Sequence, residues 1–281
     1  MLVSARELAS DARRNGYAIG AFNVGTVDGM AAVIGAAEAR RSPVIAMLWS
    51  GAVDYVDVAG LSAAMVTMAR AADVPVVVHL DHAYSLDLVS DSLDRGFSSV
   101  MFDGAALPLA DNVAGTAEAV RMARAHGASV EAVVGEIGRE YEGETGAEVR
   151  STDPEQAAAF ARAVHVDLLA IAIGTRHGHY APGAAPSLDV PLTERVAADT
   201  GVPLVLHGGS YAPDDQVKAV VAAGVGKVNV ATELEDAYLD GVRGLELGSV
   251  RFSSELSAAG CARVRRLIEA KLDLFGSTGR A

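Results

Sequence analysis

The chain alternates between short, uninterrupted hydrophobic runs and longer segments in which hydrophobic residues recur every three or four positions. The runs predict eight strands, at residues 18–22, 43–48, 76–80, 99–102, 129–134, 168–173, 203–206 and 227–230. Because most of these runs are continuously apolar and do not alternate with polar residues, the strands are expected to be buried on both faces, as in a parallel sheet.

The segments between the runs predict helices at residues 26–40, 61–72, 85–95, 112–125, 154–163, 192–200 and 213–223, after an amphipathic helix at the N-terminus. Asp153-Pro154 is typical of a helix start, and glycine follows several of the helices, as is typical of helix ends. Eight strand–helix units in 281 residues, without a linker or low-complexity tract, favour a (β/α)8 TIM barrel over an open doubly wound sheet. We therefore expect residues 1–281 to form a single α/β domain of the TIM-barrel class.

Composition narrows the choice of partners and compartment. Lysine and arginine number 23 against 36 acidic residues, a formal net charge of −13. This charge disfavours nucleic acid and anionic lipid surfaces, and no hydrophobic run is long enough to cross a bilayer. The N-terminus lacks the apolar core of a signal peptide, and Cys261 is the only cysteine. We therefore expect a cytoplasmic protein that binds neither nucleic acid nor membrane and has no intramolecular disulfide.

Three histidines follow three of the predicted strands. His82 comes after residues 76–80, His177 after residues 168–173 and His207 after residues 203–206. Since the carboxyl ends of all strands in a TIM barrel meet at one mouth, where active sites lie, the three imidazoles predict a catalytic site for Zn²⁺ or a related divalent metal. The alternative is three unrelated loop histidines.

The remaining histidines predict other roles. His79 lies inside a strand and is expected to be a hydrogen-bonded core residue, whereas His126 and His165 are expected to be structural or surface residues. His179 is a weaker candidate ligand, because its offset from the strand differs from that of His177.

Residues beside the histidines indicate the chemistry. Asp81 precedes His82 and is either a group that orients the ligand or a general acid/base. The segments after the last two strands predict a phosphate site, because TIM barrels commonly hold phosphate there and glycine lets backbone N–H groups approach closely. These segments are Gly208, Gly209 and Ser210, and Asn229, Val230, Ala231 and Thr232, and Gly178 could join them.

Two further features bear on proton transfer. Lys227 is expected at the opposite rim of the barrel, so a metal and not a lysine imine would act as the electron sink. A long loop after residues 129–134 carries Glu136, Glu140 and Glu142. It is either a lid with a carboxylate for proton transfer or a solvated acidic loop.

The strings HLDH, AIGTRHG, LVLHGGS and KVNVATEL, in this order and spacing, resemble the class II metal-dependent ketose-bisphosphate aldolases, and most of all the tagatose- and fructose-bisphosphate aldolases. The resemblance runs over essentially the whole chain. It implies an aldehyde-lyase that cleaves or forms the C3–C4 bond of a phosphorylated ketose, giving dihydroxyacetone phosphate and an aldehyde. It also implies a homodimer or homotetramer that acts in carbohydrate metabolism.

The resemblance also implies a role for each site residue. One zinc ion per chain would be held by His82, His177 and His207 and would polarise the C2 carbonyl, with Asp81 as acid/base at the C4 hydroxyl. A second acid would come from the loop that carries Glu140 and Glu142. The substrate would be held by Asn23, Gly178, Gly208, Gly209, Ser210, Asn229, Val230, Ala231 and Thr232.

The chain departs from the family pattern near the substrate. Val133 stands where the family has a metal-site glutamate, and Tyr141 stands about where it has a proton-transferring glutamate. Thr26 replaces an asparagine and Tyr211 a glycine. These departures leave open the substrate and a second metal position. They also keep two alternatives open, namely a metal-dependent barrel hydrolase, suggested by His177-Gly178-His179, and a non-catalytic sugar-phosphate binder.

Overall fold

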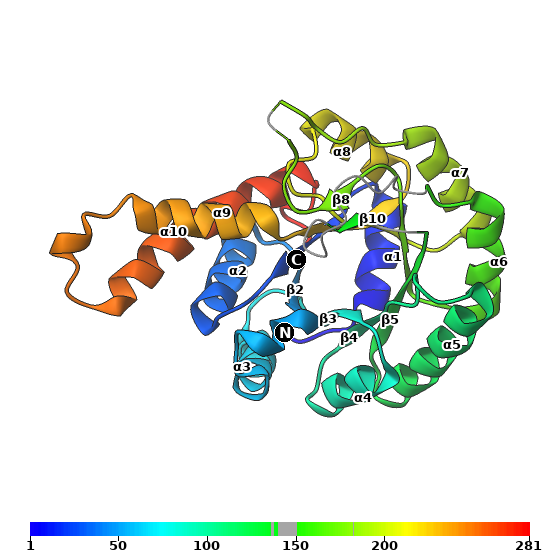
Figure 1. The fold of residues 1–281 in the computed structure, drawn as a ribbon, viewed down its shortest axis with the longest axis horizontal. Coiled ribbons are helices and arrows are strands. Elements are labelled where there is room, and N and C mark those ends of the chain that lie inside the picture. The colour runs from blue at the N-terminus through cyan, green and yellow to red at the C-terminus, as the bar shows by residue number, and fades with distance from the viewer. Residues whose placement is uncertain (136–137, 140–150, 182) are drawn as a thin grey trace.

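Eight parallel strands close into a barrel in the computed structural model, which describes residues 1–135, 138–139, 151–181 and 183–281 (Figure 1). Neighbouring strands follow the chain order, and the first strand pairs with the last, with Ala21 opposite Asn229. The barrel strands are β1 (Ile19–Asn23), β2 (Val44–Trp49), β3 (Val76–Ala83), β4 (Ser99–Phe102), β5 (Ser129–Val134), β7 (Leu168–Ile171), β9 (Leu204–Leu206) and β10 (Val225–Val230). The predicted TIM barrel is confirmed.

A layer of helices surrounds the strands (Figure 1). The helices are α1 (Ala5–Asn15), α2 (Val27–Arg40), α3 (Val58–Ala71), α4 (Leu86–Asp94), α5 (Leu109–Ala125), α6 (Pro154–Val164), α7 (Val190–Thr200), α8 (Asp214–Ala222), α9 (Thr232–Arg243) and α10 (Ser253–Leu274). Several begin where a polar side chain accepts a backbone N–H of the first turn, as Thr26, Ser85 and Asp153 do. No described helix is long and apolar enough to span a membrane.

Alternate residues of each strand face opposite layers, which explains the continuous hydrophobic runs. Val76, Val78 and Leu80 face outward and pack with the helices, whereas Val77 faces the barrel interior. The interior residues pack against Ala5, Ala9 and Ala12 of α1. Helix α1 therefore covers the N-terminal end of the barrel, opposite the mouth that the carboxyl ends of the strands form.

The boundaries differ from the predicted ones at three places that matter for the site. Strand β3 continues to Ala83 and so includes His82, whereas β7 ends at Ile171. His177 lies instead in a short strand, β8 (Arg176–His177), which pairs with β6 (Gly138–Arg139) in a second, two-stranded sheet. Two helices, α9 and α10, follow the last barrel strand and were not among the predicted helices.

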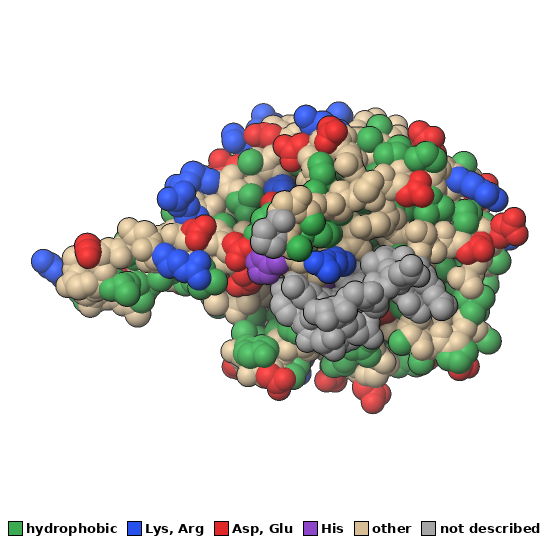
Figure 2. Space-filling view, turned by 45° about the horizontal axis from the view of Figure 1, so that its top comes forward, with side chains coloured by type: hydrophobic (Ala, Val, Ile, Leu, Met, Phe, Trp, Pro, Cys, Tyr) green, Lys and Arg blue, Asp and Glu red, His purple; other side chains and the backbone are tan. Residues whose placement is uncertain are grey.

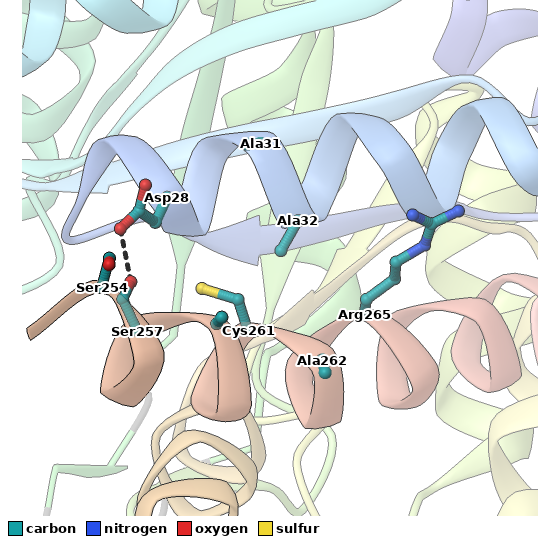
Figure 3. Close-up of a pocket in the computed structure, with 9 residues that line it drawn as sticks. Asp28, Ala31, Ala32, Ser254, Ser257, Cys261, Ala262 and Arg265 are labelled. Atoms are coloured by element: carbon teal, nitrogen blue, oxygen red, sulfur yellow. Dashed lines mark hydrogen bonds between the residues drawn. The ribbon is translucent and has the colours of Figure 1, made fainter. Parts of the chain in front are cut away.

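Helices α9 and α10 project from the barrel as a two-helix arm (Figure 1). Glycines allow the close packing of the two helices, because a Cβ at Gly241 would lie 2.4 Å from the Ala259 carbonyl oxygen and one at Gly260 would lie 2.5 Å from the Tyr238 ring. Helix α10 also packs on α2, and a cavity of about 420 Å³ lies between them (Figure 3). Its lining includes Asp28, Ala32 and Cys261 but none of the predicted site residues.

Candidate functional site

Strand β3 presents two consecutive side chains to the mouth of the barrel, although successive residues of a regular strand point to opposite faces. Leu80 pairs with Val100 and Ala83 with Phe102, so β3 has one residue more than β4 between these pairs. The bulge includes His82, whose φ of 57° lies in the left-handed region. It turns the His82 side chain from the outer face to the side on which Asp81 lies, and a His82 nitrogen is 3.9 Å from an Asp81 oxygen.

The three predicted ligands converge at this mouth. The ring centre of His82 lies 4.8 Å from that of His207 and 5.1 Å from that of His177, and the rings of His177 and His207 are 5.6 Å apart. One ring nitrogen from each histidine lies within 4.8 Å of the other two, so the three residues could hold a metal ion. Imidazole nitrogens are typical ligands of Zn²⁺ and related metals, and a three-histidine set leaves a position for substrate oxygen.

Carboxylates behind the ring orient two of these imidazoles. Asp103, just after β4, accepts from Nδ1 of His82 at 2.7 Å, and Glu131 in β5 accepts from Nε2 of His207 at 2.8 Å. All four side chains are buried. A carboxylate on the outer nitrogen fixes the ring and leaves the inner nitrogen for a metal, so the donor set fits such an ion.

The buried histidines have perturbed acidity. Burial, together with the nearby His82, lowers the pKa of His207 well below the usual 6.5. Burial and the nearby Lys227 likewise lower the pKa of His79, which hydrogen-bonds Ser99 at 2.8 Å inside the barrel as a core residue. His207 is therefore neutral at physiological pH, which is the form that binds a metal.

Asp81 lies beside the histidines and faces an asparagine from across the barrel. Its Oδ1 accepts from Nδ2 of Asn229 at 3.4 Å, and only 5% of the residue is exposed. Asn23, at the end of β1, has a buried Oδ1 with no hydrogen-bond partner among the described residues, and the same is true of Oδ1 of Asn229. These orphaned acceptors indicate that the mouth is built to receive a ligand that donates hydrogen bonds.

The segments after β9 and β10 are joined to each other, and not all of their N–H groups are open to a ligand. Gly209 donates its N–H to the Asn229 carbonyl at 2.9 Å, and a Cβ there would lie 2.7 Å from that carbonyl oxygen, so this glycine serves close packing. The Ser210 hydroxyl accepts from the backbone N–H groups of Ala231 and Glu233, at 3.2 and 3.3 Å. It thereby caps α9 and keeps its own proton for a ligand at this positive helix end.

Of the other predicted substrate-binding residues, Gly178 lies in a third loop, after β8, and the rest lie after β9 or at or just beyond the end of β10. Gly178 follows β8 with a φ of 94° and Gly208 follows β9 with a φ of 64°. Thr232 opens α9, whereas the Val230 side chain is buried in the outer core and can offer only its backbone to a ligand.

His179 and Tyr211 form a separate polar cluster at this edge. Nε2 of His179 lies 2.9 Å from Oδ2 of Asp236 in α9, and the Tyr211 hydroxyl donates to the same oxygen. Figure 2 shows a histidine at the surface beside acidic side chains where the arm leaves the barrel. His179 is therefore directed away from the three-histidine site, while Tyr211 has a φ of 59°, a conformation that favours glycine.

Some expectations fall elsewhere. Glu140 and Glu142, predicted to be catalytic, lie outside the described residues, as do Glu136 and Tyr141. Lys227 was expected at the opposite rim of the barrel. It lies instead inside the barrel, 2.7 Å from Glu131, and is only 1% exposed. Residues 227 and 229 are two apart in a strand, so their side chains point to the same face. Because Asn229 was predicted to face the substrate, the sequence could have indicated that Lys227 points inward as well.

Comparison with known proteins agrees with this site. Residues 3–280 match the family described as fructose-bisphosphate aldolase class-II. The chain is 38% identical over 284 residues to the 6-phospho-5-dehydro-2-deoxy-D-gluconate aldolase of Bacillus subtilis, covering 99% of this chain and 97% of that protein. It is 37% identical over 295 residues to a fructose-bisphosphate aldolase of Streptococcus pyogenes, covering 100% of this chain and 99% of that protein.

Solved structures give the same result. The YdjI aldolase of Escherichia coli K12 superposes with a TM-score of 0.90 at 36% identity, with full coverage of both chains. A putative fructose-1,6-bisphosphate aldolase of Coccidioides immitis superposes with a TM-score of 0.88 at 31% identity, over 98% of this chain and 96% of that one. Both the sequence match and these likenesses span the barrel and its mouth, and the chain therefore belongs to the class II fructose-bisphosphate aldolase family of carbon–carbon lyases.

Proposed function

We propose that this class II aldolase cleaves the C3–C4 bond of a phosphorylated ketose, and forms it in the reverse direction, with zinc held by His82, His177 and His207. When bound, the zinc supplies Lewis-acid polarisation of the ketose carbonyl. The observation that carries the proposal is the β3 bulge, which brings His82 to the side of the strand on which Asp81 lies and so leaves a carboxylate 3.9 Å from one of the three imidazoles.

Asp81 is proposed as the base at the substrate C4 hydroxyl. Its carboxylate accepts the hydroxyl proton, and the electron pair of the O–H bond forms the second bond of the C4 carbonyl. The C3–C4 bond breaks, and its electron pair remains on C3. Asn229 donates to Oδ1 of Asp81 and so orients the carboxylate for this transfer. The C3 carbon then takes a proton from a second acid, for which Glu140 and Glu142 are the candidates. The products are dihydroxyacetone phosphate and an aldehyde.

The phosphate of the substrate is proposed to bind at the β9 and β10 loops. The capping hydroxyl of Ser210 and the N-terminus of α9 support this position, because a helix N-terminus attracts anions even in a chain of net charge −13. Gly178, Gly208, Ala231 and Thr232 would offer further backbone or hydroxyl donors to the phosphate, whereas Gly209 would shape the cradle.

The identity of the aldehyde half of the substrate is still to be determined. The two named relatives act on different phosphorylated ketoses, and the gluconate derivative would release a carboxylated aldehyde. Trp49 pairs with Asp81 across β2 and β3 and is 41% exposed, and its ring lies over Gly51 just after the end of β2. We propose that this aromatic side chain faces the substrate beyond C4 and contributes to the choice of aldehyde.

Two other functions have less support. A barrel hydrolase would use His177 and His179 together as ligands, but His179 is directed to Asp236. A non-catalytic binder would retain the metal ligands and would not need an acid/base beside them, whereas Asp81 is buried there.

The test is zinc-dependent release of dihydroxyacetone phosphate from fructose 1,6-bisphosphate, tagatose 1,6-bisphosphate and 6-phospho-5-dehydro-2-deoxy-D-gluconate. Asp81→Ala should lower kcat by about 10²- to 10⁴-fold. It should spare exchange of the C3 proton of dihydroxyacetone phosphate with D₂O, because that step does not involve the C4 hydroxyl. Absence of turnover with every ketose phosphate at full zinc occupancy would refute the proposed function.

Assembly and location complete the proposal. We keep the expectation of a cytoplasmic homodimer or homotetramer, and the projecting arm supports assembly because Leu247 and Phe252 at its end are 64% and 67% exposed. Light scattering coupled to size-exclusion chromatography measures the assembly, and a monomer at micromolar concentration would contradict it.

A further inference from the structure

A group of polar side chains fills the barrel interior below the three histidines. His79, Ser99, Glu131 and Lys227 face inward, and each is at most 1% exposed. Burying an ion pair in a core is costly, and apolar residues of similar size often pack there as well or better. The presence of Glu131 and Lys227 at this depth therefore points to a requirement other than packing.

Glu131 uses its two oxygens for two different partners. Oε1 lies 2.8 Å from Nε2 of His207, and Oε2 lies 2.7 Å from the ammonium of Lys227. His207 lies just after β9, Glu131 in β5 and Lys227 in β10, and their contacts form a continuous hydrogen-bonded series from the barrel core to the mouth.

These contacts determine which ring nitrogen of His207 is left to bind a metal. A carboxylate oxygen can only accept, so Nε2 of His207 carries the proton and Nδ1 keeps its lone pair. Nδ2 of Asn229 does not compete for that lone pair, because it lies 3.4 Å from both ring nitrogens and so along the direction of neither. His207 is thereby left with Nδ1 as its ligand atom.

Lys227 contributes by holding the other end of the carboxylate. With its ammonium on Oε2, the carboxylate cannot rotate and Oε1 remains directed at His207. We propose that Lys227 and Glu131 are positioning residues for the metal site, in which the ion pair fixes the tautomer and orientation of His207. This role rests on the proposed metal binding, and it makes the Glu131 oxygen on Nε2 of His207 the determinant of metal affinity, with Lys227 acting only by neutralising and holding that carboxylate.

Two double variants separate this role from a structural one. Glu131→Leu with Lys227→Met, and Glu131→Gln with Lys227→Met, both remove the two charges together and keep the volume similar. Only the glutamine retains an oxygen that accepts from Nε2 of His207. Its amide NH₂ would face His79, whose Nε2 has no hydrogen-bond partner among the described residues. The two double variants therefore differ in whether residue 131 accepts a hydrogen bond from Nε2 of His207.

The measurements are the zinc dissociation constant, from competition with a chelator, and the ¹⁵N chemical shifts of the His207 ring in metal-free protein. Circular dichroism and thermal unfolding check that both variants fold. The leucine variant should bind zinc about 10- to 100-fold more weakly than the wild type, and the glutamine variant should lie within a few-fold of it. The wild-type spectrum should show the proton on Nε2.

The outcomes separate this role from the function on which it rests. Equal zinc affinity in the two folded double variants, or a wild-type His207 with its proton on Nδ1, would overturn the positioning role alone. A wild type that binds no zinc would overturn the proposed metal site together with it.

Discussion

Asp103 offers a sharp test of how the mouth is held for a metal. Its Oδ2 accepts from Nδ1 of His82 at 2.7 Å, and its Oδ1 accepts from the backbone N–H of Ala105 at 3.1 Å. Asp103→Ala removes both contacts, so the His82 ring loses the group that fixes its orientation. Asp103→Asn keeps one oxygen, which can serve His82 or Ala105 but not both.

The size of the effect follows from these contacts. Loss of a carboxylate that orients a ligand histidine weakens metal binding by about 10- to 100-fold, which is about 1.4–2.7 kcal/mol. The asparagine variant should fall between alanine and wild type. Since a charged hydrogen bond contributes about 1.5–3 kcal/mol, the alanine variant should also lose about this much stability without metal.

The assay is chelator competition for zinc, with urea unfolding of the metal-free protein alongside it. The matched control is Asp111→Asn, which changes an exposed carboxylate in the first turn of α5 and should leave zinc affinity unchanged. Activity of Asp103→Ala should recover as zinc approaches saturation. A folded Asp103→Ala protein with wild-type zinc affinity would refute the orienting role of this carboxylate.

Three further results are expected. Because burial, and after it Lys227, lowers the pKa of His79 well below 6.5, the unfolded chain binds more protons below that pH. The urea-derived free energy of unfolding should fall below pH 6.5 by up to about 1.4 kcal/mol per pH unit from this residue, and an unchanged slope in His79→Gln would contradict this. The free energy of unfolding of Tyr211→Gly should be about 1 kcal/mol higher than that of Tyr211→Ala, because glycine adopts the left-handed φ of this position without strain. Equal free energies of unfolding would contradict the left-handed conformation at residue 211. Ser210→Ala should cost about 1 kcal/mol through loss of the α9 cap and should raise KM for the phosphorylated ketose, and an unchanged KM would place the phosphate elsewhere.

The barrel itself was predictable from the sequence. Runs such as residues 43–48 are apolar throughout because one face packs on helices and the other on the barrel interior, so the local composition already indicates this burial. The order of eight strand–helix units then leaves little choice of topology. The three histidines were found for the same reason, since His82 and His207 lie at the carboxyl ends of barrel strands and His177 lies in the segment that follows β7.

Tertiary structure decided what the residues at the mouth can do. In HLDH, Asp81 and His82 would point to opposite faces of a regular strand, and only the bulge against β4 brings them to one side. Lys227 was expected at the opposite rim, yet the inward facing of its strand places it against Glu131 in the core. Pairing register and long-range contacts between strands depend on all of the barrel at once, so the local pattern contains the candidates but not the side on which each one acts.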